Sequence, residues 1–233
     1  MNILLTGASR GIGAAARSAL ESSGHRVAGQ STKGDATLLA ADFSDPAAPR
    51  QLWDAALDQL GQIDVLINNA GVFEPFDLTG SDDDWHAAWA RTMTVNLQSA
   101  ADLSRLAIQH WQQRKSGGRI VNVASRAAYR GDSPAHWHYA ASKGGMVAMT
   151  KSIARGYAAE GILAFAVTPG FTVTEMTEDY LASRGGEKIL ADIPLGRVAS
   201  AAEVGETIRW LATDAPPSAT GAVIDVNGAS YVR

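Results

Sequence analysis

Short apolar runs alternate with longer stretches of helical periodicity along this chain. Runs such as VLIN at residues 65–68 are bounded by polar or turn-forming residues, as buried strands are. This pattern predicts strands near residues 2–6, 25–29, 37–41, 63–68, 119–124, 162–168 and 222–226. It predicts helices near residues 11–23, 47–60, 82–90, 96–115, 137–160 and 201–213.

The alternation of strands and helices predicts a seven-stranded parallel sheet covered by helices on both faces, a doubly wound α/β fold. Residues 30–41 leave hardly any room for a helix, so we expect a loop at that crossover. No linker or repeat divides the chain, and we expect one domain over residues 1–233. Residues 171–195 are long for a connection, which is typical of a flexible substrate loop.

Composition narrows the classes of function. The net charge is −4, and charged residues of both signs make up 19% of the chain, which argues against nucleic-acid or polybasic membrane binding. Cysteine is absent, so disulfides and Cys-based zinc sites are excluded, and we expect no metal. No run approaches a membrane span, and the chain enters a strand pattern at once. We therefore expect a cytoplasmic protein.

A glycine-rich turn, TGASRGIG at residues 6–13, joins the first predicted strand to the first predicted helix. Gly7 lets the chain turn sharply, Gly11 lets the backbone approach a ligand, and Gly13 lets the helix pack closely on the sheet. The helix N-terminus offers amides and a positive dipole to a phosphate. Many such turns use glycine for geometry alone, but the place of this one in an alternating chain favours a phosphate site.

Further polar residues follow predicted strands or open the next helix. NNAG at residues 68–71 ends the fourth strand, either as part of a ligand site or as an Asx turn. Ser125 ends the fifth strand, at the same edge of the sheet. Tyr139 and Lys143 are one helical turn apart and share a face, so they are either a working pair or a surface pair.

In their order and spacing these motifs resemble the short-chain dehydrogenase/reductase family, and most closely its 3-oxoacyl-acyl-carrier-protein reductase type, a pattern that reductases of other substrates share. The resemblance runs from residue 2 to 229 and also includes Asn96 in VNLQSA, TPG at 168–170, and IPLGRVASAAEV followed by TGAVIDVNGA. It implies a Rossmann-like fold and hydride transfer between a nicotinamide cofactor and a carbonyl or secondary-alcohol carbon.

The resemblance implies four catalytic residues. Tyr139 would be the general acid in reduction and the base in oxidation, and we expect the Lys143 ammonium to lower its pKa from about 10. Lys143 would also bind the cofactor ribose, and Ser125 would hold the substrate oxygen. Asn96 would open its helix for a water relay. Ser125 precedes Tyr139 by 14 residues, one more than the family's commonest spacing.

The resemblance also implies where the cofactor lies. Enzymes of this fold that prefer NAD usually place a carboxylate at the end of the second strand, whereas here no acid precedes Asp35. Arg10, helped by Thr32 and Lys33, would face a 2′-phosphate, so NADP(H) is favoured over NAD(H). The cofactor residues implied are Gly7, Ser9, Arg10, Gly11, Ile12, Gly13, Thr32, Asp42, Phe43, Asn69, Ala70, Gly71, Tyr139, Lys143, Pro169, Gly170, Thr172 and Thr174, with Asp42 and Phe43 at the adenine.

Other side chains have simpler explanations. His136 and His138 lack an orienting acid and fit a loop or pocket wall, and Ser81 fits a helix N-cap rather than a metal site. Arg126 and Arg130 are either surface residues or contacts for an acidic acyl carrier protein. Packing explains Trp89, Trp111 and Trp210, while Phe73, Glu74, Tyr129, Trp137 and Phe171 are candidate walls of the substrate pocket.

The leading interpretation is an NADP(H)-dependent oxidoreductase of a small carbonyl or alcohol substrate, with 3-oxoacyl thioesters as one candidate. The alternatives are a sugar, polyol or other small-ketone dehydrogenase of the same family, and a catalytically silent dinucleotide sensor. The complete catalytic set argues against the sensor. By analogy we expect a homotetramer or homodimer through the helices near 96–115 and 137–160.

Overall fold

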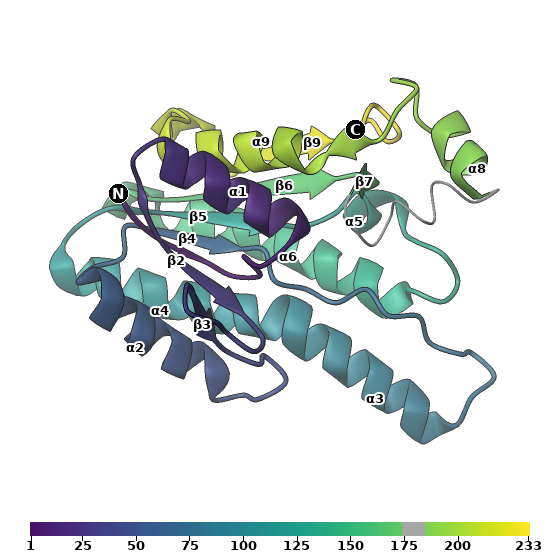
Figure 1. The fold of residues 1–233 in the computed structure, drawn as a ribbon, viewed down its shortest axis with the longest axis horizontal. Coiled ribbons are helices and arrows are strands. Elements are labelled where there is room, and N and C mark those ends of the chain that lie inside the picture. The colour runs from purple at the N-terminus through teal and green to yellow at the C-terminus, as the bar shows by residue number, and fades with distance from the viewer. Residues whose placement is uncertain (174–184) are drawn as a thin grey trace.

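A single sheet of seven parallel strands organises the computed structural model, which describes residues 1–173 and 185–233 (Figure 1). Its strand order is β3-β2-β1-β4-β5-β6-β9, so the order in which strands join the sheet reverses between β1 and β4. The strands are β1 (Asn2–Leu5), β2 (Arg26–Ser31), β3 (Leu38–Ala40), β4 (Val65–Asn68), β5 (Gly118–Val123), β6 (Ile162–Pro169) and β9 (Val223–Val226). The predicted doubly wound, Rossmann-like fold is confirmed.

Helices cover both faces of the sheet (Figure 1). On one face lie α1 (Gly11–Ser22) and α9 (Ala201–Thr213), and on the other lie α2 (Ala48–Leu60), α4 (Ser99–Arg114) and α6 (Trp137–Tyr157). Successive strand residues point to opposite faces, so Ile3 and Leu5 join the core under α1 and α9 while Leu4 joins the other core. This two-sided burial is why the strands are almost continuously apolar.

The hydrophobic pattern of the sequence did not predict several short helices and strands. The helix α3 (Asp82–Met93) runs past its predicted end into a π-helical turn, η1 (Thr94–Gln98), which leads into α4. The other short elements are α5 (Ala127–Arg130), η2 (Ala158–Glu160), β7 (Thr172–Val173), α8 (Gly185–Ala191), β8 (Ala199–Ser200) and η3 (Pro217–Ala219). Between β2 and β3 the chain forms the predicted loop. Residue 174, predicted to bind the cofactor, and much of the predicted 171–195 loop lie outside the described residues.

The structure shows where the expected N-cap Ser81 and the tryptophans Trp111 and Trp210 lie. Ser81 is the N-cap of α3, as expected, and its Oγ accepts a hydrogen bond from the Asp84 amide at 3.1 Å. Trp111 is fully buried, and its indole donates to the Ile63 carbonyl at 2.8 Å. Trp210, which was also expected to pack, lies on α9 with 37% of its surface exposed.

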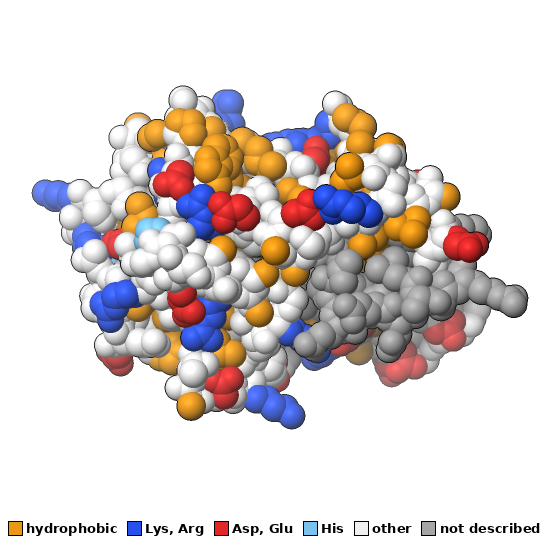
Figure 2. Space-filling model, turned by 45° about the horizontal axis from the view of Figure 1, so that its top comes forward, with side chains coloured by type: hydrophobic (Ala, Val, Ile, Leu, Met, Phe, Trp, Pro, Cys, Tyr) orange, Lys and Arg blue, Asp and Glu red, His pale blue; other side chains and the backbone are white. Residues whose placement is uncertain are grey.

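The face that carries α1 and α9 shows acidic and basic side chains next to one another (Figure 2). Several form ion pairs, including Arg17 with Glu21 at 2.8 Å and Arg209 with Glu206 at 2.7 Å. Such exposed pairs contribute little stability, so the two apolar cores stabilise the fold. Among the described helices, none is long and apolar enough to cross a membrane.

A pair of glycines tests the packing of Trp111 on the sheet. A Cβ at Gly118 would lie 2.1 Å from the Trp111 ring, whereas a Cβ at Gly156, on an exposed stretch of α6, would meet nothing within 4 Å. We expect Gly118→Ala to lower the free energy of unfolding by about 1–3 kcal/mol through overpacking. Gly156→Ala should raise it by about 0.5 kcal/mol through helix propensity. Urea unfolding of both variants checks this, and equal effects would contradict it.

Candidate active site

A cavity of about 420 Å³ lies across the carboxyl ends of the strands. It contains every described residue that the sequence assigned to the cofactor, together with Ser125. The expected lining residues are Gly7, Ser9, Arg10, Gly11, Ile12, Gly13, Thr32, Asp42, Phe43, Asn69, Ala70, Gly71, Ser125, Tyr139, Lys143, Pro169, Gly170 and Thr172. Sequence reasoning missed Gln30, Ser31, Val72, Arg91, Val95, Val123 and Ala124, which also line it.

The glycine turn is closely packed at the N-terminus of α1. Gly7 has a φ of 66°, and a Cβ at Gly13 would lie 1.9 Å from the Gly7 carbonyl oxygen. Gln30, buried in β2, accepts the Gly7 amide at 2.8 Å and donates to the Ala41 carbonyl at 2.7 Å. The signal in the sequence was an amide side chain directly after the apolar residues of β2, where a buried polar group needs hydrogen-bond partners.

The turn after β4 is bound to the glycine turn. The Thr6 hydroxyl accepts the amides of Asn69 and Ala70, each at 3.0 Å. The Asn69 side chain donates to the carbonyl of Gly7 at 3.0 Å, and the Asn68 side chain donates to Asn122 of β5 at 2.8 Å. These side chains bind other segments, so the NNAG motif is a junction between strands rather than an Asx turn.

The end of the cavity near β2 carries a cation and no carboxylate from the β2 end. Arg10 is the N-cap residue of α1 and lines the cavity with Thr32, whereas Lys33 is not among the lining residues. Asp35, the first acid after β2, lies outside the cavity and accepts the amides of Thr37 and Leu38 at 2.6 and 3.0 Å. This end therefore suits an additional phosphate.

Tyr139 and Lys143 line the other end of the cavity with Ser125. Ser125 accepts the Ala127 amide at 3.1 Å, which fixes its hydroxyl at the start of α5. The Lys143 ammonium donates to the Val123 carbonyl at 2.8 Å and lies 5.8 Å from the centre of the Tyr139 ring. The ammonium thus lies beside the β5 end and the phenol ring.

Burial governs the protonation of both groups. It raises the pKa of Tyr139 to about 12, although a hydrogen bond with Ser125 acts in the opposite direction. Burial also lowers the pKa of Lys143 from 10.5 to about 8. The net pKa of Tyr139 is therefore raised and not lowered as expected, because desolvation of the phenol dominates. At neutral pH the phenol holds its proton and the ammonium is mostly charged.

Asn96 lies behind these residues, in the π-helical turn. It is fully buried, accepts the Val72 amide at 2.7 Å and donates to the Val72 carbonyl at 3.0 Å. A Cβ at Gly71 would lie 3.2 Å from Asn96 Oδ1 and 3.5 Å from Lys143 Nζ, so glycine leaves the two side chains room. The structure thus brings Asn96 close to Lys143 without exposing it to the cavity.

The aromatic candidates divide between the cavity and its surroundings. Phe73 lines the cavity and packs edge-on against Tyr139, with ring centres 4.8 Å apart. Trp137 packs against Phe76 outside the cavity lining, whereas Tyr129 stacks on Tyr231 near the C-terminus.

The expected pocket-wall histidines lie beside the cavity. The His136 ring stacks on Phe73, while His138 is 1% exposed and accepts the Tyr139 amide at 3.0 Å. Burial lowers the pKa of each histidine. Among the described residues, no group of three or more His, Asp or Glu side chains is placed to hold a metal ion.

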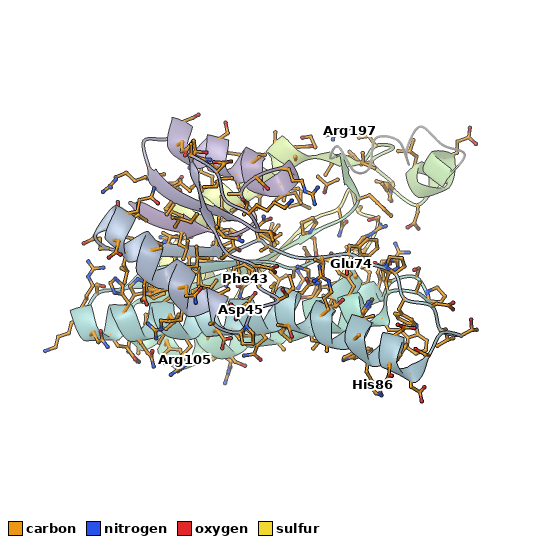
Figure 3. All side chains as sticks on the ribbon, turned by 60° about the horizontal axis from the view of Figure 1, so that its bottom comes forward. Phe43, Asp45, Glu74, His86, Arg105 and Arg197 are labelled. Carbon is orange, nitrogen blue, oxygen red and sulfur yellow. The ribbon has the colours of Figure 1, made fainter. Side chains whose placement is uncertain are left out.

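Three charged candidates already lie next to an opposite charge. Glu74 binds Arg91 of α3 through two contacts of 3.0 and 3.3 Å, and Figure 3 shows it between the end of the sheet and α3. Arg130 donates to Asp192 at 2.6 Å. The expectation that Arg126 is a surface residue is wrong, because its side chain is 11% exposed, with its guanidinium 3.6 Å from Asp192 and packed over Phe171.

The cavity fits a dinucleotide cofactor. Along the strand order, it is lined by Asp42 and Phe43 after β3, then by the amides and the cation at the α1 N-terminus after β1, and then by Ser125 after β5 with the Tyr139 phenol and the Lys143 ammonium. The turn around Gly7 and Gly13 is too close for Cβ atoms, because a Cβ at Gly7 would meet Asn69 and Ala70 and a Cβ at Gly13 would meet the Gly7 carbonyl. The described residues thus provide anion binding at one end and proton transfer at the other.

Comparison with known proteins agrees with this geometry. A family profile described as enoyl-(acyl carrier protein) reductase matches residues 7–229. The chain is 33% identical over 241 residues to the 3-oxoacyl-acyl-carrier-protein reductase of Salmonella typhimurium, covering 98% of this chain and 96% of that protein. It is 36% identical over 244 residues to the enzyme of that name from Synechocystis, with 97% and 94% covered. It is 33% identical over 244 residues to an uncharacterized short-chain type dehydrogenase/reductase of Sinorhizobium fredii, with 96% and 94% covered.

The buried ammonium predicts an unusual effect of Lys143→Met on stability. Because the folded state lowers the Lys143 pKa from 10.5 to about 8, the unfolded chain binds the proton more tightly. This destabilises the fold by about 3 kcal/mol below pH 8, and the cost disappears as the pH rises through 10.5. We expect Lys143→Met to raise the free energy of unfolding of the cofactor-free protein by about 1–3 kcal/mol at pH 7, and by less at pH 10.

Urea unfolding at both pH values measures this effect. Lys151→Met is the matched control, since Lys151 is an exposed lysine on the same helix and should change stability little at either pH. A Lys143→Met protein that is less stable than the unmodified one at pH 7, or a gain that does not depend on pH, would show that the ammonium is not desolvated.

Proposed function

This chain belongs to the short-chain dehydrogenase/reductase family of oxidoreductases, and we propose that it transfers a hydride between NADP(H) and the carbonyl or secondary-alcohol carbon of a small molecule, with Tyr139 as general acid and base. The observation that carries the proposal is one cavity lined at one end by the glycine turn and at the other by Tyr139, Lys143 and Ser125. Anion binding and proton transfer are thereby combined in a single site.

In the proposed reduction, Tyr139 and Ser125 act on the substrate oxygen. When bound, the nicotinamide supplies the hydride in reduction and accepts it in oxidation. As negative charge develops on the carbonyl oxygen, the Ser125 hydroxyl donates a hydrogen bond to it and Tyr139 donates its proton. The pKa of about 12 supports this direction, because the phenol is protonated at neutral pH.

Lys143 and Asn96 have supporting roles in this proposal. The Lys143 ammonium binds the cofactor ribose and favours the phenolate that Tyr139 forms after donating its proton. Its pKa of about 8 leaves it charged at neutral pH. Asn96, paired with the Val72 backbone in the π-helical turn, holds the helix open for a water that returns a proton to this end of the site.

The cofactor preference for NADP(H) follows from charge. The family uses NAD(H) or NADP(H), and here Arg10 and Thr32 line the cavity near the β2 end. The carboxylate that would repel a 2′-phosphate is absent from that end, since Asp35 is held in its own turn. A guanidinium forms charge-assisted hydrogen bonds with a phosphate, which favours the phosphorylated cofactor.

Assays with a panel of substrates distinguish the two alternatives, which are another substrate class and a catalytically silent dinucleotide sensor. The relatives from Salmonella typhimurium and Synechocystis are named for 3-oxoacyl-acyl-carrier-protein substrates, so an acetoacetyl thioester belongs in the panel beside simple ketones, sugars and polyols. A catalytically silent dinucleotide sensor would bind NADPH and reduce no member of that panel. The complete set of Asn96, Ser125, Tyr139 and Lys143 favours the enzyme.

The role of Tyr139 is tested by Tyr139→Phe. We expect kcat for carbonyl reduction to fall at least about 1,000-fold, since the substitution removes the donated proton and leaves the ring in place. The dissociation constant for NADPH, measured by fluorescence titration, should change less than about threefold. If the variant retains more than a tenth of the turnover, another group donates the proton and the proposed mechanism is wrong.

The role of Arg10 is tested by Arg10→Ala. We expect kcat/KM for NADPH to fall about 10- to 100-fold, the effect of losing a charged hydrogen bond, while kcat/KM for NADH changes little. Arg17→Ala is the control, because Arg17 lies on the same helix but outside the cavity, paired with Glu21. Equal losses with both cofactors would exclude recognition of the 2′-phosphate by Arg10.

A further inference from the structure

Phe73 lies at the catalytic end of the cavity, where the reacting carbonyl is proposed to bind. It follows the NNAG turn and packs edge-on against the Tyr139 ring, with an interplanar angle of 80°. Its surface is nevertheless 53% exposed. An aromatic side chain that is fixed beside the proton donor and still accessible is placed to contact a substrate rather than to fill the core.

His136 supports Phe73 from one side. The two rings are stacked, with centres 3.9 Å apart and an interplanar angle of 5°. The His136 Nδ1 lies 2.7 Å from the Ser133 hydroxyl, so the imidazole is itself held in place. Burial lowers the pKa of His136, which keeps the ring uncharged at neutral pH. One face of Phe73 is thus covered by a neutral ring.

The segment that carries Phe73 is also anchored from behind. The Phe76 amide donates to the Ala135 carbonyl at 3.1 Å, which joins this segment to the start of α6. The buried Phe76 ring packs edge-on against Trp85, Trp137 and His138, with ring centres 4.5 to 5.7 Å apart. These contacts restrict the loop, so the position of Phe73 is largely preformed.

The carboxylate that follows Phe73 in the chain is paired. Glu74 is bound by both contacts to Arg91 of α3 (Figure 3). The surface formed by Phe73, His136 and Tyr139, here called the aromatic wall, consists of three aromatic rings that carry no charge of their own at neutral pH. Such a surface favours a flat apolar group over a charged or heavily hydroxylated one.

We propose that the aromatic wall selects carbonyl substrates with an aromatic ring attached directly to the carbonyl carbon, and that Phe73 is the specificity-determining residue. This inference rests on the proposed function, since it takes Tyr139 as the proton donor. Stacked and edge-on aromatic pairs prefer ring centres about 4.5–7 Å apart. The Phe73 ring centre lies 4.8 Å from that of Tyr139, and about half of the Phe73 surface is exposed, so Phe73 is available beside the proton donor for contact with a ring attached to the carbonyl carbon. A linear acyl chain gains no such contact.

Three ketones distinguish the effect of an aromatic ring from the effects of size and apolar volume. Acetophenone carries the aromatic ring, acetylcyclohexane has the same carbon skeleton without aromaticity, and butanone is small. Initial rates of NADPH oxidation give kcat/KM for each ketone, with acetoacetyl thioester as the linear comparison. We expect the unmodified enzyme to prefer acetophenone to acetylcyclohexane by about tenfold, and to prefer it to the thioester.

Variants at Phe73 then assign the preference. Phe73→Ala should lower kcat/KM for acetophenone about tenfold and for butanone less than threefold, while Phe73→Leu, which keeps most of the apolar volume, should reduce the acetophenone-to-acetylcyclohexane ratio to about one. Leu78→Ala is the control, since Leu78 is 61% exposed on the same connection and should leave all three values unchanged. Equal losses on all ketones would mean that Phe73 only positions Tyr139.

The binding of an unreactive alcohol tests the inference without requiring catalytic turnover. With NADPH present, 1-phenylethanol forms a complex that cannot react, so its dissociation constant can be measured by calorimetry. We expect Phe73→Ala to weaken this binding about tenfold and to leave the binding of 2-butanol unchanged. A preference for acetoacetyl thioester, or 1-phenylethanol binding that does not depend on Phe73, would overturn the inference. If no ketone is reduced but the alcohol still binds through Phe73, the proposed function fails and the aromatic site remains.

Discussion

The junction between β1 and β4 is the constraint on which the rest of the site depends. There the Thr6 hydroxyl receives the amides of Asn69 and Ala70, while Asn69 donates back to the Gly7 carbonyl. These bonds hold two turns that are more than sixty residues apart in the chain against each other. Because the strands are parallel, the ends of β5 and β6 arrive at the same edge, which brings Ser125 and Pro169 into the same cavity.

The catalytic end of the cavity costs stability that the apolar cores offset. A mostly charged ammonium at Lys143 is nearly inaccessible, and the helix unwinds by a π-turn at Asn96. Two large cores compensate, one on each face of the sheet, containing fully buried residues such as Trp111 and Phe165. Desolvation of a charged group is thus concentrated where proton transfer is proposed, as in other sites with shifted pKa values.

Most of the fold was predictable because buried helices and strands place apolar residues at regular intervals in the sequence. Every strand of the main sheet and every long helix was expected near its observed position, since apolar strands covered on both faces have few alternatives. The missed elements are short. The pair of β7 with β8 depends on contacts between distant segments, and no local pattern of residues specifies it. The π-turn around Asn96 also left no period in the sequence, and only the family resemblance implied that the helix opens there.

For the site, the sequence by itself determined the residue types and their order: the glycine turn, NNAG, Ser125, Tyr139 and Lys143, which carry the family resemblance. Only the tertiary structure decided their environments. It buried the Tyr139 phenol so that its pKa rises rather than falls, and it placed Gln30 behind the glycine turn. It also stacked Phe73 on His136, a pair of rings that the sequence separates by more than sixty residues. Residue type and spacing are local properties of the chain, whereas desolvation and ring stacking depend on which distant segments fold against each other.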